Sequence, residues 1–267
     1  MTPHDRPIGV FDSGIGGLGV LKSIVKLLPH ENLVYFADSM RCPYGPRSQK
    51  EIQEIIYSVV SYLLKHHDIK LAVAACNSAT VAGIDFLRKE FPNLPFVGVV
   101  PVIKPASMLS ETGNIGCLAT DMTVRSETQA SLIENHAGNV TVHNMACHGL
   151  VELIEGGDFQ SVALENMLKE YIHPLLDKEI DVLALGCTHY TLVKDMVEKL
   201  VPESVKVMDS NDPVARRVKD VLSQANLLRE SGIAHYEFLV HGDLNRYERS
   251  LAVILDGLFT SARSVTV

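Results

Sequence analysis

The sequence predicts an α/β protein made of two α/β domains with parallel-rich sheets. Short apolar runs alternate with longer segments of helical periodicity, which is the pattern of repeated strand–helix–strand units. The expected strands are continuously apolar, as in parallel sheets that are buried on both faces. With 267 residues, the chain is long enough for roughly two domains.

The expected strands are short runs rich in β-branched and apolar residues. In chain order they are Pro7–Asp12, Asn32–Asp38, Leu71–Cys76, Phe96–Val99, Asn114–Ala119, Val140–Asn144, Val182–Gly186, Val205–Asp209 and Glu237–Val240. The expected helices are longer segments in which apolar residues recur with helical spacing. In chain order they are Gly17–Leu28, Ser48–His66, Asn77–Lys89, Ile103–Glu111, Thr123–Ala137, Leu150–Gly156, Phe159–Asp177, Tyr190–Leu200, Asp212–Ala225 and Asn245–Leu258.

Proline residues mark two breaks in this alternation. One lies near Pro101 and the other just before Pro213. The breaks predict a first domain formed by residues 1–98 and 210–267, and a second, smaller α/β domain formed by residues 99–209. In this arrangement the chain leaves the first domain and later returns to it.

A weak internal sequence similarity indicates that the two halves of the chain are related. Cys76 lies in LAVAACNSATV and Cys187 in VLALGCTHYTL, and each follows an apolar strand and opens a helix. The spacing between these cysteines is close to the spacing between Asp12 and Thr120, which end two other expected strands. If the two halves face each other, the two cysteines face each other as well.

The composition excludes several classes of protein. A hydrophobic content of 46% with 21% charged residues excludes a disordered chain. The net charge of −8, without a long basic run, argues against a nucleic-acid partner. No apolar run reaches the roughly 18 residues of a membrane span, and no secretory signal is present, so we expect a cytoplasmic protein without a membrane partner. Its five scattered cysteines do not suit a disulfide framework and leave thiols for chemistry.

The glycine-rich segment after the first strand has three interpretations. Gly14–Gly19 matches G-x-G-x-x-G, and Asp38 lies where a ribose-binding acid would follow, so a dinucleotide-dependent oxidoreductase is one possibility. Asp12 and Ser13 weaken it, because Asp12 puts a negative charge where the pyrophosphate would lie. In a second interpretation the glycines only allow the helix N-terminus to pack closely. In a third, the loop binds a substrate carboxylate at the helix N-terminus, and Asp12 binds an ammonium group.

The two strand-end cysteines are the strongest signal of chemistry. Cys76 opens a helix at the carboxyl end of a strand, where the helix dipole lowers the pKa of a thiol and where open α/β sheets bind ligands. Cys187 repeats this arrangement, with His189 close enough in sequence to tune its pKa or relay its proton. The Cys-x-His spacing does not match a structural zinc site, so we expect no metal.

Two equivalent thiols suit a reaction that is symmetric in space, whereas a single nucleophile would need only one. In a racemisation, one thiolate removes the α-proton from one face of the carbon and the opposed thiol protonates the other face. Thiol pKa values near 8.5 need only a modest shift for this work. No lysine motif for a pyridoxal phosphate Schiff base stands out, so we expect no cofactor.

Motifs along nearly the whole chain resemble those of the glutamate racemases, in the aspartate/glutamate racemase superfamily. In family order they are DSGIGGL (12–18), the PYG pattern from Asp38 to Gly45, CNSA (76–79), VIKPA (102–106), LAT-x-x-TV-x-S (118–126), LVELIE (150–155), GCTHY (186–190) and DS (209–210). The resemblance implies two pseudo-symmetric α/β domains with the active site in the cleft between them. It also implies a homodimer that interconverts L- and D-glutamate without cofactor or metal, and a supply of D-glutamate for bacterial peptidoglycan.

The resemblance implies roles for individual residues. Cys76 matches the thiol that deprotonates the D-enantiomer, and Cys187 matches the thiol that deprotonates the L-enantiomer. Asp12 and His189 match the auxiliary residues beside these thiols. Further matches are the assisting acids Asp38 and Glu155 and the substrate-contact residues Asp12, Ser13, Pro43, Tyr44, Gly45, Asn77, Ser78, Thr120, Thr123, Thr188 and His189.

Alternatives stay open at this point. A racemase of another acidic amino acid, such as aspartate, would use the same chemistry. The dinucleotide-dependent oxidoreductase leaves both cysteine motifs unexplained, and a non-catalytic binding protein would not need both thiols. The chain also departs from the family pattern at Ser78, Val100, Cys147-His148 and Glu152. These positions bear on substrate preference and regulation.

Overall fold

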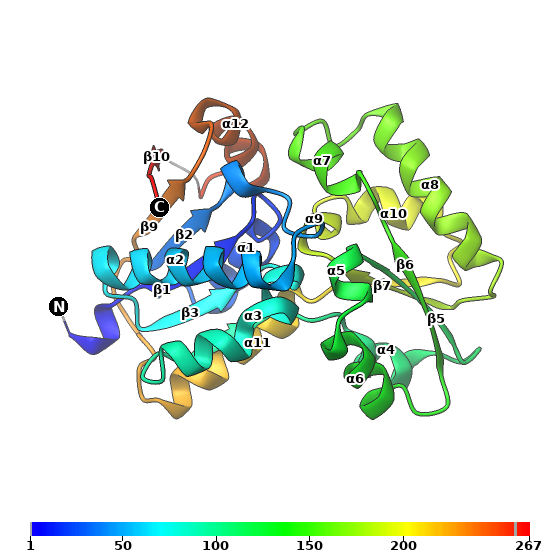
Figure 1. The fold of residues 1–267 in the computed structure, drawn as a ribbon, viewed down its shortest axis with the longest axis horizontal. Coiled ribbons are helices and arrows are strands. Elements are labelled where there is room, and N and C mark those ends of the chain that lie inside the picture. Colours follow the sequence, from blue (N-terminus) through cyan, green and yellow to red (C-terminus); the bar gives the residue numbers. More distant parts are fainter. Residues whose placement is uncertain (1, 259–260) are drawn as a thin grey trace. The chain divides into compact units, whose positions relative to one another are not determined.

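The chain folds into two compact units, shown in Figure 1 as a computed structural model that describes residues 2–258 and 261–267. The first unit comprises Met1–Val99 and Asn211–Val267, and the second comprises Val100–Ser210. In the described part of the chain, no helix is both long and apolar enough to cross a membrane.

The first unit contains a parallel sheet with the strand order β10-β9-β2-β1-β3-β4. Its strands are β1 (Ile8–Asp12), β2 (Leu33–Ala37), β3 (Leu71–Ala74), β4 (Phe96–Gly98), β9 (Tyr236–Val240) and β10 (Ala262–Ser264). Every residue of β1, β2 and β3 is buried. This burial on both faces explains why their sequences are continuously apolar.

Helices cover both faces of this sheet. They are α1 (Leu18–Leu27), α2 (Gln49–His67), α3 (Asn77–Glu90), α11 (Asn211–Gln224) and α12 (Leu244–Ile254), with short 3-10 helices η1 (Pro3–Asp5) and η2 (Ser39–Arg41). Since parallel crossovers are right-handed, α1 between β1 and β2 lies on the face opposite to α2, which leads back to β3. The packing agrees, because α1 contacts α11 and α2 contacts α3 (Figure 1).

The longest helix, α2, shows how the sequence sets its own boundaries. Ser48 accepts a hydrogen bond from the Glu51 backbone N–H, and the Glu51 carboxylate accepts one from the Ser48 backbone N–H, which forms a capping box. The buried residues of α2 form one stripe from Ile52 to Leu63 with helical spacing. The helix ends at His67, and Asp68, which follows it, adopts a left-handed conformation.

The second unit contains a parallel sheet with the strand order β6-β5-β7-β8. Its strands are β5 (Asn114–Ala119), β6 (Thr141–Ala146), β7 (Val182–Gly186) and β8 (Lys206–Met208). Its helices are α4 (Ile103–Leu109), α5 (Asp121–Val124), α6 (Glu127–His136), α7 (Leu150–Glu155), α8 (Val162–Leu176), α9 (Thr188–Thr191) and α10 (Lys194–Leu200).

The two sheets share one topology. In the run β2-β1-β3-β4, the first strand in sequence is flanked by the second on one side and by the third and fourth on the other, and β6-β5-β7-β8 repeats this order. Cys76 follows β3 and Cys187 follows β7, so the two cysteines occupy the same topological position in their units. The weak internal similarity in the sequence therefore corresponds to a shared strand order in the two sheets.

Three elements differ from the sequence expectation. The single helix expected over Thr123–Ala137 is divided into α5 and α6, because the Ser126 hydroxyl caps a new helix by accepting from the Gln129 N–H. The helix expected over Tyr190–Leu200 is α10, preceded by the short helix α9. The short edge strand β10 was not expected, since its sequence Ala-Arg-Ser lacks an apolar run.

Candidate active site

In the first unit, Asp12 lies at the carboxyl end of the central strand β1. Its side chain is buried, and Oδ1 accepts a hydrogen bond of 2.7 Å from the Gly14 N–H. A Cβ atom at Gly17 would lie 2.8 Å from the Asp12 Cβ and 2.9 Å from the Ala75 Cβ. The glycine-rich loop therefore allows the start of α1 to pack closely against the ends of β1 and β3.

Cys76 lies at the carboxyl end of the neighbouring strand β3, where it precedes the first turn of α3. Only 5% of its surface is exposed, and its Sγ lies 3.9 Å from Ser13 Oγ. The half-buried Cys42 places its own Sγ at the same distance from this hydroxyl, so Ser13 connects two thiols. Asn77 and Ser78 are buried directly after Cys76. Among the described residues, Asn77 Nδ2 has no hydrogen-bond partner, so this buried donor is available to a ligand.

Asp38, at the end of β2, is the centre of a buried polar cluster in the same unit. Arg41 Nε lies 2.9 Å from Oδ1 and 2.7 Å from Oδ2, and the Tyr44 hydroxyl donates to Oδ2 at 2.5 Å. His241 Nδ1 lies 2.8 Å from Oδ1. The carboxylate is completely inaccessible to solvent, so these groups replace the water that would otherwise stabilise its charge.

Tyr44 connects this cluster to Cys76. Burial raises the pKa of the Tyr44 hydroxyl well above its ordinary value, and the neighbouring Asp38 and Cys76 raise it further. The Tyr44 hydroxyl therefore stays protonated and donates a hydrogen bond to Asp38. Pro43 and Gly45 flank Tyr44 in the turn between η2 and α2, so the PYG motif lies in the same unit as Cys76.

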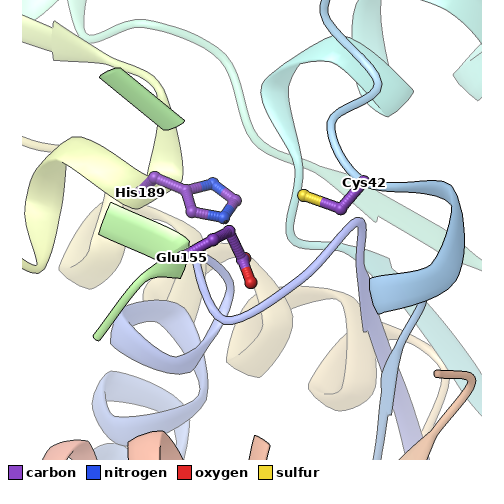
Figure 2. Close-up of side chains that lie close together, drawn as sticks. All are labelled: Cys42, Glu155 and His189. Carbon is purple, nitrogen blue, oxygen red and sulfur yellow. Dashed lines mark hydrogen bonds and ion pairs between the residues drawn. The ribbon is translucent and has the colours of Figure 1, made fainter. Parts of the chain in front are cut away.

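In the second unit, Cys187 lies at the carboxyl end of β7 and precedes α9, with 4% of its surface exposed. Thr188 and His189 follow it and are also buried. Figure 2 shows the His189 imidazole beside the Glu155 carboxylate, which comes from the last residue of α7. His189 Nε2 and Glu155 Oε1 are 2.6 Å apart, so the Glu155 carboxylate fixes the ring of His189.

Other cysteines of the second unit are poor acid–base groups. Burial raises the pKa of the Cys117 thiol to about 12. Burial also raises the pKa of the Cys147 thiol, and nearby Cys187 adds to this rise. The Tyr190 hydroxyl donates to the Cys147 carbonyl oxygen at 3.3 Å and is itself buried. Both thiols therefore stay protonated near neutral pH.

Two threonines lie at the carboxyl end of β5, the central strand of the second sheet. Thr120 caps α5 by accepting a hydrogen bond of 3.3 Å from the Thr123 N–H, and the two hydroxyl oxygens are 3.1 Å apart. Both residues are buried. Their position beside β7 places their hydroxyl groups at the same sheet edge as Cys187.

The residues predicted from sequence thus divide between the two units. Sequence reasoning did not single out Arg41 or His241, which complete the Asp38 cluster. The signal for His241 is positional, since it follows β9, whose register places Val240 beside Ala37. Within a single unit, the described residues bring no three His, Cys, Asp or Glu ligand atoms into a metal-binding group.

Comparisons with known proteins show which family the chain resembles. The family model for Asp/Glu/hydantoin racemases matches residues 8–218. A glutamate racemase of Ectopseudomonas mendocina is 41% identical over 96% of this chain and 97% of its own length. The crystal structure of glutamate racemase isoform RacE1 from Bacillus anthracis matches with a TM-score of 0.87, at 31% identity over 98% of both chains. A structure of Escherichia coli glutamate racemase in complex with L-glutamate and the activator UDP-MurNAc-ala has the same TM-score and identity, and covers 97% of this chain and 98% of its own.

These matches confirm two expectations from the sequence. The α/β fold with parallel sheets is confirmed by the solved structures, which align over nearly the whole chain. The resemblance to glutamate racemases is confirmed by relatives that cover nearly the entire chain at about 40% identity. On this evidence, the chain belongs to the Asp/Glu/hydantoin racemase family.

Proposed function

We propose that this protein interconverts L- and D-glutamate by proton transfer between two thiols, without a cofactor or metal. The observation that carries the proposal is the matching placement of Cys76 and Cys187. Each is buried, follows the equivalent strand of a sheet with the same strand order and precedes a helix. The glycine-rich loop then serves the packing of α1 and the binding of substrate, and not the binding of a dinucleotide.

The proposed chemistry moves one proton at a time. With D-glutamate, the Cys76 thiolate removes the α-proton, so that an S–H bond forms and the C–H electron pair stays on the α-carbon. The Cys187 thiol then protonates the opposite face of the carbanion and becomes a thiolate. With L-glutamate the two thiols exchange roles. Buried donors and helix dipoles stabilise the negative charge of the intermediate.

In this proposal each thiol has its own assisting groups. In the first unit, Asp12 and Asp38 assist Cys76. In the second unit, His189 assists Cys187, and Glu155 holds its ring at 2.6 Å. A histidine whose imidazole is hydrogen-bonded to a carboxylate is suited to receive or donate a proton beside a thiol.

Polar groups at both sheet edges supply contacts for the substrate. Asn77 is the best-supported of these, because its buried Nδ2 has no partner among the described residues and suits a substrate carboxylate. The proposed substrate-contact residues are Asp12, Ser13, Pro43, Tyr44, Gly45, Asn77, Ser78, Thr120, Thr123, Thr188 and His189. The proposal also includes a homodimer, which light scattering of the purified protein would test. It further includes a cytoplasmic location and a supply of D-glutamate for bacterial peptidoglycan.

Proton NMR in D₂O tests the proposed function directly. The purified protein is incubated with L- or D-glutamate and, in parallel, with L- or D-aspartate, without added cofactor. Loss of the glutamate α-proton signal, together with appearance of the opposite enantiomer on a chiral column, is the expected result. Exchange with aspartate alone would keep the mechanism and change the substrate, whereas no exchange with any of the four would overturn the proposal.

A further inference from the structure

His241 lies beside Asp38 although 203 residues separate them in sequence. β9 pairs with β2 in parallel, with Val240 opposite Ala37, so the residues that follow the two strands meet at one sheet edge. The backbones are also joined, because the His241 N–H donates to the Ala37 carbonyl at 2.9 Å. The His241 carbonyl in turn accepts a hydrogen bond of 2.7 Å from the Met40 N–H, which fixes η2.

The side chain of His241 completes the set of donors around a carboxylate that water does not reach. Arg41 contacts both oxygens of Asp38, but His241 Nδ1 approaches Oδ1 from a different strand, at 2.8 Å. A carboxylate only accepts hydrogen bonds, so Nδ1 carries the hydrogen in this pair. His241 is itself buried, so its ring has little freedom to leave Asp38.

The cluster reaches Cys76 through the turn that follows η2. Asp38 Oδ2 accepts the hydrogen bond from Tyr44, and Tyr44 is close enough to Cys76 for the thiol to influence its ionisation. In the same turn, Cys42 contacts Ser13 Oγ, which also contacts Cys76. A change in the position of Asp38 would therefore move the groups that surround Cys76.

We propose that His241 is a positioning residue for the Cys76 side of the reaction, because it holds Asp38 in the orientation that fixes Tyr44 and the turn beside Cys76. This inference rests on the proposed function and adds to it a residue that acts through Asp38 without touching substrate. It assigns His241 to proton transfer at one thiol, so its loss should change deuterium uptake differently for the two enantiomers.

The test compares His241→Leu, which removes the donor, with His241→Asn, whose side-chain amide can donate from nearly the same place. The chain offers a matched control in His67, whose Nδ1 lies 3.2 Å from Glu237 Oε2. Glu237 lies near the opposite end of β9 from His241, so His67→Leu breaks a similar pair far along the same strand. If His241→Leu does not fold, as judged by circular dichroism, His241→Ala replaces it.

The first measurement is deuterium uptake and inversion from each glutamate enantiomer in D₂O. We expect His241→Leu to slow inversion about tenfold, as for loss of one hydrogen bond to a charged group. Deuterium should still enter L-glutamate with retention, because Cys187 remains competent, while uptake into D-glutamate slows. His241→Asn should restore most of the inversion rate, and His67→Leu should keep the wild-type ratio of uptake to inversion.

The second measurement does not depend on racemisation. Alkylation of Cys76 by iodoacetamide is followed by peptide mass spectrometry in each folded variant. We expect it to be several-fold faster in His241→Leu, because the loosened turn exposes the thiol, and unchanged in His67→Leu. Equal alkylation rates of Cys76 in wild type and His241→Leu would overturn the proposal. The same ratio of deuterium uptake to inversion in these two proteins would also overturn it. If the wild-type protein does not racemise glutamate, the proposed function fails separately and the alkylation result alone decides the role of His241.

Discussion

Replacement of Glu155 by glutamine probes the Cys187 side of the proposed reaction. Glutamine has nearly the same shape as glutamate, and its side-chain oxygen still accepts a hydrogen bond from His189 Nε2. The change therefore leaves the packing of α7 intact and removes only the negative charge that lies 2.6 Å from the imidazole. In the proposed mechanism this charge stabilises His189 when the ring carries a proton beside Cys187.

The size of the effect follows from the contact that is weakened. Both side chains are buried, so solvent does not screen their interaction. A hydrogen bond to a charged group contributes about 1.5–3 kcal/mol and a neutral one about 0.5–1.5 kcal/mol, so the loss of charge costs about 1–1.5 kcal/mol. Each 1.36 kcal/mol is tenfold in rate, and we therefore expect Glu155→Gln to slow inversion by about 5- to 15-fold. The melting temperature should change little, because an acceptor for the Nε2 hydrogen is retained.

Deuterium uptake in D₂O identifies which thiol is affected. Glu155→Gln should still incorporate deuterium into D-glutamate with retention, because Cys76 can remove that proton, whereas uptake into L-glutamate should slow with inversion. Glu152→Gln is the control, since Glu152 is an exposed residue of the same helix. Inversion within twofold of wild type, or an equal loss of uptake into both enantiomers, would refute the assignment of the Glu155–His189 pair to Cys187.

Three further predictions test the thiols and the fold. Cys76→Ser and Cys187→Ser should each abolish inversion, measured on a chiral column, while each retains deuterium uptake into one enantiomer by NMR, and wild-type turnover in both would exclude the two-thiol mechanism. Lys70 and Glu31 form a fully buried ion pair of 2.6 Å, so Lys70→Met should lower the free energy of unfolding in urea by about 3–5 kcal/mol, and adding Glu31→Leu should recover most of the loss. Native Cys117, with its pKa raised to about 12, should stay unmodified by iodoacetamide at pH 8 and react only after unfolding, as seen by peptide mass spectrometry.

The strands were predictable because burial on both faces leaves a continuous apolar signal. Val182–Gly186 shows this clearly, since all five residues are buried and the expected and observed bounds agree. The edge strand β10 lacks that signal, because Ala262–Ser264 is held by pairing with β9 and is mostly exposed. Its formation depends on a neighbour that sequence periodicity does not identify.

The site was partly predictable for a similar reason. Cys76 and Cys187 come directly after apolar strands and before helices, so local sequence alone places them at the ligand-binding edge of a parallel sheet. His241 follows a strand too, but its role depends on β9 lying beside β2, and so on contact with Asp38. Strand order is a tertiary property, and the return of the chain after the second unit hides it from local patterns.

The different surroundings of the two thiols limit what kinetic measurements can reveal. One thiol lies in the unit with Asp38, Tyr44 and His241, and the other lies in the unit with His189 and Glu155. Enantiomers have equal free energies, so kcat/KM for inversion must be the same in both directions, whichever group is changed. A variant that damages one thiol therefore slows inversion equally from L- and D-glutamate. Only the ratio of deuterium uptake to inversion, measured separately for each enantiomer, distinguishes damage on one side of the α-carbon from damage on the other.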